Sequence, residues 1–414
     1  MKKLYFVIVC AIIFAMLLCS CAKADGGDTD SALPEPVSSQ PETESTVSEP
    51  ESQPEDDTPK KRDTGWVEGV KWSEGTIMLA DNVSYVPFTK DESIPDGQTV
   101  SAPRRENEDF YASGFLSDRS GFYLMLPVNA DLNGLYNVKN GKRTLVEKGY
   151  TCNIRIVDDK IYYLRELNDD NNGKSYFQFV MKKNGKETVL ADCEYLFFIY
   201  CKDFVMYSDY HDGKSYKLEY ENNTATQIPY RHYLFEYKDR IYYYNPFEDY
   251  TYSTDKSLED GQKVVPGKAV EAKNDCLYTA KYRIVQDTYT LSRFNLETGE
   301  YEDLVSGLPR WQTDDLAFTD NYLLVFADNT LYKIGERFDK IEKVFEVDCK
   351  QMNGKSKGLT EIRARCAGAS DNRILIYGSS ITDTMSKYYQ KTFVIDTDGN
   401  IIYSYTHTSP FTGA

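Results

Sequence analysis

A five-residue pattern recurs seven times along this chain and constrains its fold more than any other feature. Each occurrence has Asp or Ser first and mostly apolar or aromatic residues from the third position, as in Asp159-Lys160-Ile161-Tyr162-Tyr163. The occurrences begin at Ser120, Asp159, Asp203, Asp239, Asp275, Asp320 and Asp371. Successive ones are 36 to 51 residues apart, about 42 on average. Such a period predicts a chain built of repeated structural units.

Turn signals between apolar segments accompany the repeat. They are Asn140-Gly141, Asn184-Gly185, Thr298-Gly299 and Asp398-Gly399. Asn-Gly and Asp-Gly between apolar runs are strong signals for two-residue β-hairpins. The 34 tyrosines and 20 phenylalanines of the 414 residues suit half-buried strands. No apolar pattern of helical period extends beyond about two turns.

Units of about 42 residues with four short strands are typical of β-propeller blades. We therefore predict an all-β fold, a single β-propeller of seven four-stranded antiparallel blades. Residues 66–88 hold further strands, which could pair with the last blade or form an eighth blade. The alternative fold is a β-sandwich or two stacked β domains.

The N-terminus predicts export. Fifteen apolar residues, 4–18, follow Lys2 and Lys3 and end in Leu18-Cys19-Ser20-Cys21. A cationic start, a short apolar run and a small residue are typical of a secretory signal. The end of the run resembles the bacterial lipobox, Leu-x-[Gly/Ala/Ser]-Cys, which implies a diacylglycerol on Cys21. An uncleaved membrane anchor is the alternative, although a spanning helix needs about 20 residues.

Residues 22–63 are dominated by Ser, Pro, Glu, Thr and Asp. So few apolar residues cannot offset the entropy lost on folding, so a disordered tether is predicted. The domains are then a signal peptide at 1–21, the tether at 22–63 and the propeller at 64–414. The expected location is the outer, extracytoplasmic face of the cell membrane, with the lipid as anchor.

The formal net charge of −17 argues against binding to nucleic acid, and no basic stretch with interleaved aromatic residues occurs. The partners expected are the membrane, through the lipid, and a protein or glycan ligand. We expect a monomer.

The Asp-x-Ile-Tyr-Tyr segments Asp159–Tyr163 and Asp239–Tyr243, followed by turns such as Asn184-Gly185 and Thr298-Gly299, carry a resemblance. The chain resembles Firmicute surface lipoproteins whose propeller is similar to that of low-density-lipoprotein-receptor-type proteins. The Tyr-Trp-Thr-Asp tetrapeptide of the receptor propeller is absent here. The resemblance implies a binding or scaffolding role and supplies no catalytic residues.

Signals for catalysis are few. The three histidines, His211, His232 and His407, are scattered, and no Gly-x-Ser-x-Gly, P-loop or dinucleotide motif occurs. Carboxylate pairs such as Glu248-Asp249 and Asp314-Asp315 could serve glycoside chemistry, but acidic residues are too common to select one. We therefore predict no catalytic residue.

Six cysteines lie in the predicted propeller: Cys152, Cys193, Cys201, Cys276, Cys349 and Cys366. Their apolar surroundings favour buried free thiols, and Cys193–Cys201 or Cys152–Cys201 are the alternative disulfides. Asn168–Gly173 half-matches a calcium loop, but Phe179 occupies the position of the bidentate Glu. No metal or cofactor is predicted, and calcium at this turn is the alternative.

A tyrosine-rich segment, 242–252, is the predicted recognition loop, with Tyr243, Tyr244, Phe247, Tyr250 and Tyr252 as the binding residues. A strand edge with exposed aromatic residues would explain the same segment. The predicted function is a lipid-anchored extracytoplasmic binding or scaffolding protein that acts through propeller loops. The alternatives are an extracellular hydrolase or lyase, with acidic residues at the propeller mouth acting on polysaccharide or cell-wall material, and an accessory of a membrane complex.

Overall fold

The computed structural model describes residues 59–63, 65–88, 115–118, 121–126, 134–157, 159–169, 174–259, 261–283, 286–309, 317–348, 359–370, 372–382 and 387–410. All belong to the unit Thr58–Ala414. Every regular element in these ranges is a β-strand, as predicted. The predicted signal peptide, Cys21 and nearly all of the tether lie outside the described residues. No helix in the described ranges has the length and apolarity needed to cross a membrane.

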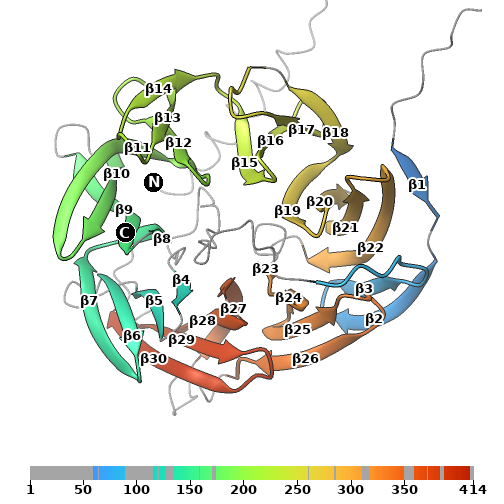
Figure 1. The fold of residues 1–414 in the computed structure, drawn as a ribbon. Helices are drawn as coiled ribbons and strands as arrows, with labels where there is room; N and C mark the ends of the chain where they lie inside the picture. The colour runs from blue at the N-terminus through green and yellow to red at the C-terminus, as the bar shows by residue number, and fades with distance from the viewer. Residues whose placement is uncertain are drawn as a thin grey trace, which may run out of the picture. The chain divides into compact units, whose positions relative to one another are not determined.

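The described strands form six hydrogen-bonded sheets, which Figure 1 labels in chain order. The first is β4 (Phe115–Asp118), β5 (Gly121–Leu126), β6 (Gly134–Lys139) and β7 (Lys142–Lys148). The second is β8 (Thr151–Val157), β9 (Lys160–Asp169), β10 (Lys174–Lys183), β11 (Lys186–Tyr200), β12 (Phe204–Asp209), β13 (Ser215–Glu219) and β14 (Ala225–Ile228). The third is β15 (His232–Tyr237), β16 (Arg240–Asn245), β17 (Tyr250–Thr254) and β18 (Gln262–Pro266).

The fourth sheet contains β19 (Lys268–Lys273), β20 (Cys276–Arg283), β21 (Thr288–Asn295) and β22 (Glu300–Pro309), together with β1 (Lys60–Arg62), β2 (Trp66–Trp72) and β3 (Gly75–Ala80). The fifth is β23 (Ala317–Phe318), β24 (Tyr322–Ala327), β25 (Thr330–Gly335) and β26 (Ile341–Glu346). The sixth is β27 (Leu359–Ser370), β28 (Arg373–Thr382), β29 (Lys387–Asp396) and β30 (Ile401–Pro410). Apart from β1, all pairings between neighbouring strands are antiparallel.

The recurring Asp of the sequence pattern ends a tight turn between the first two strands of a unit. Lys238 and Asp239 have φ of 48° and 59°, and Asn274 and Asp275 have φ of 53° and 59°. Two consecutive residues with positive φ are typical of the type I′ turn, which matches the twist of a hairpin. Asp and Asn tolerate this left-handed region better than most residues. The feature that recurs in the sequence pattern is therefore a tight turn, and the first two strands of a unit lie on either side of it.

Apolar clusters join each sheet to the next one along the chain. From the first sheet to the sixth, the pairs that illustrate these contacts are Leu135 with Ile154, Met206 with Ile241, Tyr242 with Leu277, Tyr278 with Leu323, and Leu331 with Ile374. A further cluster joins Leu375 and Val394 of the sixth sheet to Phe122 and Leu124 of the first. This last contact closes the circuit, so every sheet has both faces buried. The fold is therefore a β-propeller (Figure 1).

The second sheet has enough strands for two units. The first part of β11 pairs with β10, and its last residues, Phe198–Tyr200, pair with β12 after an irregularity that follows Cys193. A cluster around Phe179 and Val205 fills the space between the two halves. The strands thus allow two four-stranded units that share β11, and the number of seven blades stays a prediction.

Residues 59–63 and 65–88, here called the N-terminal arm, differ from both predicted placements. The β2–β3 hairpin pairs with β22 through Leu79 and Val305, so it neither pairs with the last sheet nor forms a sheet of its own. Strand β1, within the last residues predicted for the tether, pairs in parallel with the start of β22. The physical reason is that β22 would otherwise present an unpaired edge to solvent, and the arm covers it.

The cysteines agree with the interpretation as free thiols. Cys193, Cys201 and Cys276 are buried and free. Both predicted disulfides require Cys201, so the structure contains neither. Burial raises the pKa of the Cys201 thiol well above its ordinary value, which keeps it protonated and unreactive. Cys349 and the side chain of Cys366 lie outside the described residues.

Candidate functional site

The turns of the propeller gather at two opposite ends of its sheets, because neighbouring strands run antiparallel. The polar-turn end contains the turns at 201–203, 238–239, 255–261, 274–275 and 296–299. Contacts between neighbouring sheets confirm that these turns share one end, since Lys238 pairs with Asp275, and Lys256 Nζ lies 2.7 Å from Asp203 Oδ2. The aromatic-turn end contains the turns at 210–214, 229–231 and 246–249.

The residues exposed at the two ends differ. The aromatic-turn end presents Tyr230, which is 68% exposed, and Phe247, which is 98% exposed. Tyr210 lies at the same end and stacks on Tyr176, with ring centroids 4.9 Å apart. The polar-turn end presents Asp and Lys side chains whose charges pair with one another, and the exposed ring of Tyr85 there is hydrogen-bonded through its hydroxyl to Glu336. Exposed aromatic rings are the informative exception on a protein surface, so the aromatic-turn end is the candidate binding surface.

Three of the five predicted binding residues lie on one face of the third sheet. Tyr243 and Tyr252 are direct cross-strand partners, and their rings stack with centroids 5.3 Å apart and an interplanar angle of 18°. Tyr250 makes an edge contact with Tyr252 at 6.4 Å. Lys263 Nζ lies 4.1 Å from the centre of the Tyr250 ring. Such aromatic and cation–π pairs each contribute about 0.5–1.5 kcal/mol and fix the rings in place.

Tyr243 also packs against the body of the protein. The guanidinium of Arg231 lies 4.6 Å from the centre of its ring, and Tyr233 makes an edge contact at 6.1 Å. Segment 255–261 passes over the same ring, since a Cβ added to Gly261 would lie 1.8 Å from Tyr243 Oη. Tyr243 is therefore a packing residue beneath the candidate surface, whereas Tyr250 and Tyr252 lie farther out on β17.

Tyr244 points to the opposite face from Tyr243, because successive strand residues alternate. Its hydroxyl donates a hydrogen bond of 2.8 Å to Asp249 Oδ1, and the Tyr252 hydroxyl donates one of 2.6 Å to Glu248 Oε2. Burial and the bond to Asp249 raise the pKa of Tyr244 to about 12. The bond to Glu248, followed by burial, raises the pKa of Tyr252 to about 12. Both hydroxyls are therefore fixed donors at neutral pH.

Phe247 stands alone at the tip of the β16–β17 turn. Its backbone N–H donates to Asn245 Oδ1 at 3.1 Å, and Asn245 Nδ2 donates to Glu248 Oε1 at 2.9 Å. The turn is also tied to the next connection, because Gly267 N donates to Asp249 O at 2.8 Å. These bonds hold an exposed aromatic ring on a well-ordered turn. The predicted set thus divides into three residues on one face, Tyr244 on the other and Phe247 at the tip.

Sequence reasoning missed Tyr230, Arg231 and Lys263. The signal for Tyr230 was an aromatic residue beside Pro229 in the connection between two apolar strands, where its side chain is 68% exposed. Arg231 and Lys263 make cation–π contacts with Tyr243 and Tyr250. They were missed because these contacts depend on which strands pair.

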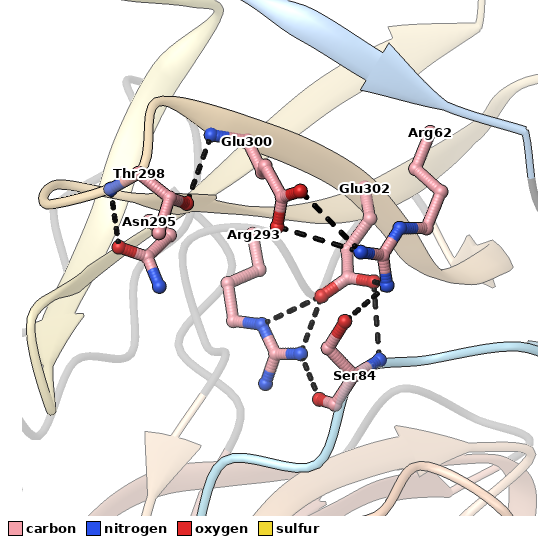
Figure 2. A network of polar contacts seen from close by, with 7 residues as sticks. All are labelled: Arg62, Ser84, Arg293, Asn295, Thr298, Glu300 and Glu302. Carbon is pink, nitrogen blue, oxygen red and sulfur yellow. Dashed lines mark hydrogen bonds and ion pairs between the residues drawn. The ribbon is translucent and has the colours of Figure 1, made fainter.

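Sequence reasoning also missed a row of polar side chains that crosses the fourth sheet near the polar-turn end. Cross-strand pairing places Glu271, Tyr278, Arg293, Glu302 and Arg62 in one line over β19, β20, β21, β22 and β1. Arg293 is only 2% exposed, and its Nε donates to Glu302 Oε1 at 3.1 Å. Figure 2 shows Glu302 between Arg293 and Arg62, with Ser84 N donating to Glu302 Oε2 at 3.2 Å. This network binds the N-terminal arm to the ring.

Glu271, at the inner end of this row, has an unusual environment. Burial raises its pKa to about 7, although Ala272 N donates a 3.0 Å hydrogen bond to its Oε1. A raised carboxyl pKa is typical of a general acid, but a glycosidase needs a second carboxylate. The pair Glu248 and Asp249 accepts hydrogen bonds from tyrosine hydroxyls, and Asp314-Asp315 lies outside the described residues. We therefore do not assign a catalytic role to any of them.

The remaining predicted candidates are separate. His211 Nε2 lies 3.0 Å from Asp192 Oδ2, His232 contacts the Tyr230 ring, and the side chain of His407 lies outside the described part. Within the described ranges, no group of three or more His, Cys, Asp or Glu could hold a metal ion. Most of the calcium-like turn, residues 170–173, is not described. Asp396 accepts hydrogen bonds from Asp398 N and Asn400 N at 3.0 and 2.8 Å, as in an ordinary polar turn.

Comparisons with known proteins give distant structural similarity only. No protein-family model matches the sequence, and no curated protein matches it. A chain of the nidogen–laminin complex is similar in structure, with 10% identity and a TM-score of 0.32 over 60% of this chain and 90% of that chain. A candidate 6-phosphogluconolactonase from Bacteroides uniformis gives 10% identity and 0.32 over 76% and 100% of the two chains. The extracellular domain of a candidate one-component system from B. thetaiotaomicron gives 10% and 0.33 over 73% and 59%. Scores this low carry no functional information, and the assignment as a propeller rests on the closed packing of the sheets.

Proposed function

We propose that this protein is a lipid-anchored, extracytoplasmic binding protein that contacts its ligand with the aromatic-turn end of the propeller. The observation that carries this proposal is Phe247, a 98% exposed aromatic ring on a turn held by hydrogen bonds. A turn whose backbone is already held by hydrogen bonds loses little conformational entropy on binding. Truncation of such an anchor typically costs 2 kcal/mol or more of binding free energy.

The position of the N-terminal arm supports this assignment. Lys60 pairs with Glu300, beside the Thr298-Gly299 turn of the polar-turn end. Strand β1, the first described strand, therefore begins at the end opposite to Phe247. A ligand that arrives from outside the membrane meets the aromatic-turn end without passing the attachment of the tether.

The ligand class we propose is a protein or glycan of the cell envelope. The test uses fluorescently labelled protein and isolated cell envelopes, one sample untreated, one digested with protease and one digested with muramidase. We expect binding to untreated envelopes and a loss of at least about 10-fold in affinity for Phe247→Ala. Loss after protease digestion would indicate a protein ligand, and loss after muramidase a glycan. The matched control is Val67→Ala on β2, where the valine is also exposed. Equal binding of wild type and Phe247→Ala would contradict the proposal.

The anchor requires its own test. Mass spectrometry of the membrane-extracted protein should show Cys21 at the mature N-terminus with a diacylglyceryl group. Cys21→Ala should release the protein from the membrane fraction, because an acyl chain contributes about 0.8 kcal/mol for each buried CH₂. An unmodified Cys21 would reject lipid anchoring and leave the binding surface to be judged by the envelope assay.

A further inference from the structure

We propose that the seam between the fourth and fifth sheets is a peptide-binding groove, filled in cis by residues 81–88, so that the N-terminal arm acts as a strap across this seam. This inference does not rest on the proposed binding function. It rests on the contacts of the arm with two sheets that are far from it in sequence.

The apolar part of the groove holds Phe88, which is 3% exposed. Its ring makes edge contacts with Phe338 at 5.7 Å, Phe318 at 6.0 Å and Tyr278 at 6.4 Å. Tyr278 comes from the fourth sheet, whereas Phe318 and Phe338 come from the fifth. Val83 and Val86 pack against the same cluster. Phe88 therefore occupies the place where the two sheets meet.

Polar groups at the rim of the groove hold the backbone of the segment. Phe88 N donates to Glu336 Oε2 at 3.0 Å, and the Tyr85 hydroxyl donates to Glu336 Oε1 at 2.7 Å. From the other sheet, Asn274 Nδ2 donates to Pro87 O. A carboxylate from one sheet and an amide from the other thus bind the same short peptide, as expected of a groove that recognises an extended segment.

An ionic clamp holds the arm before it reaches the groove. Lys61 Nζ lies 2.9 Å from Asp303 Oδ2, and Arg62 Nη1 lies 3.7 Å from Glu302 Oε2. Arg293 donates to Ser84 O from beneath, as Figure 2 shows. Because Arg293 and Glu302 are almost fully buried, their contacts to Ser84 attach the arm to a charge pair that is largely shielded from solvent. The strap therefore has two attachments, one ionic and one apolar.

The arm should outcompete the same peptide supplied from outside. A segment joined to its groove by a short connection has an effective concentration in the millimolar range. A synthetic peptide of residues 59–88 at micromolar concentration therefore cannot displace the strap of the wild-type protein. Removal of the Phe88 ring from the strap should weaken it by ~100-fold, as for other buried Phe→Ala changes, and leave the groove open to the peptide.

The experiment measures fluorescence anisotropy of labelled peptide 59–88 with the full chain. We expect the peptide to bind the Phe88→Ala protein at least ~10-fold more tightly than the wild type. A peptide that itself carries Phe88→Ala is the matched control and should bind at least ~10-fold more weakly than the native peptide. Equal binding of the native peptide to both proteins, or no binding to either, would overturn the proposal.

Two further variants test whether the effect of Phe88→Ala arises from an open groove or from misfolding. Phe88→Leu keeps an apolar side chain but loses the edge contacts to three aromatic rings, so it should bind the added peptide with intermediate affinity. Tyr85→Phe removes only the hydrogen bond to Glu336 from a half-exposed ring and should bind it no better than wild type. The order Phe88→Ala, Phe88→Leu, Tyr85→Phe supports a groove, and any order in which Tyr85→Phe comes first contradicts it.

Discussion

The two ends of the propeller use side chains for different purposes. At the polar-turn end, Lys and Asp charges pair with one another, and the N-terminal arm is bound by the buried pair Arg293–Glu302. At the aromatic-turn end, Phe247 and Tyr230 face solvent and contribute little to the core. We therefore propose that stability and ligand binding depend on opposite ends of this fold. Substitutions at one end should therefore lower stability, and substitutions at the other should lower binding.

The largest loss of stability is expected from Glu302→Gln. The change leaves the buried Arg293 guanidinium without its counter-charge, which costs about 3–5 kcal/mol. The matched control is Glu300→Gln, since this carboxylate is 56% exposed and its pair with Arg62 should contribute no more than about 1 kcal/mol. Urea unfolding of both variants measures the two values. Equal destabilisation would show that the buried network is not what holds the arm.

The next effect is a dependence of stability on pH. The pKa of Glu271 is about 7 in the folded state and near 4.5 in the unfolded chain, so the folded state binds the extra proton between these values. The free energy of unfolding should fall as pH rises from about 5 to 7 and then level off. Glu271→Gln should abolish this component, on the order of 1–3 kcal/mol for a half-buried carboxyl. If the difference in the free energy of unfolding between wild type and Glu271→Gln were constant from pH 5 to 8, the raised pKa of Glu271 would be ruled out.

A smaller effect is expected at the tight turns of the polar-turn end. Gly185 has φ of 76° and open space around the position of a Cβ. Gly185→Ala should therefore cost about 1–2 kcal/mol through backbone strain alone. Gly335→Ala is the matched control, because a Cβ there also meets nothing and its φ is not positive. Thermal unfolding should separate the two variants, and identical melting temperatures would argue against the type I′ turn at Asn184-Gly185.

The smallest effect on stability is expected at the aromatic-turn end. Phe247→Ala should change the free energy of unfolding by less than about 0.5 kcal/mol, because the ring is solvated before and after unfolding. Urea unfolding beside wild type provides the measurement. A loss above 1 kcal/mol would mean that Phe247 is a packing residue, and the contrast between the ends would disappear.

The sequence predicted the fold class and the hairpins because both depend on local chemistry. Asp239 and Asn184 have positive φ, which Asp and Asn tolerate. The spacing of Asp239 and its counterparts revealed the repeat, and Asn184-Gly185 indicated a hairpin. The position of the N-terminal arm could not be predicted, because it depends on which distant edge, β22 or β30, is available for pairing. The row from Glu271 to Arg62 was missed for the same reason, since its five members come from separate strands.

The candidate site was partly predictable. The tyrosine-rich segment 242–252 was predicted as a recognition loop, whereas the structure places most of it in β16 and β17, with Phe247 at the tip of the turn between them. The division of Tyr243 and Tyr244 between opposite faces follows from strand alternation once the strand bounds are known. The contacts of Tyr243 with Arg231 and Gly261 could not be seen, because they depend on how the connections that precede β15 and β18 pack on the third sheet.

The most direct test compares Phe247→Ala and Gly185→Ala in the same two assays, binding to isolated cell envelopes and thermal unfolding. The separation of the two ends predicts that Phe247→Ala loses at least about 10-fold in binding at an unchanged melting temperature, and that Gly185→Ala melts earlier but binds as wild type. Wild-type binding by Phe247→Ala, or a parallel loss of binding and stability in both variants, would contradict it.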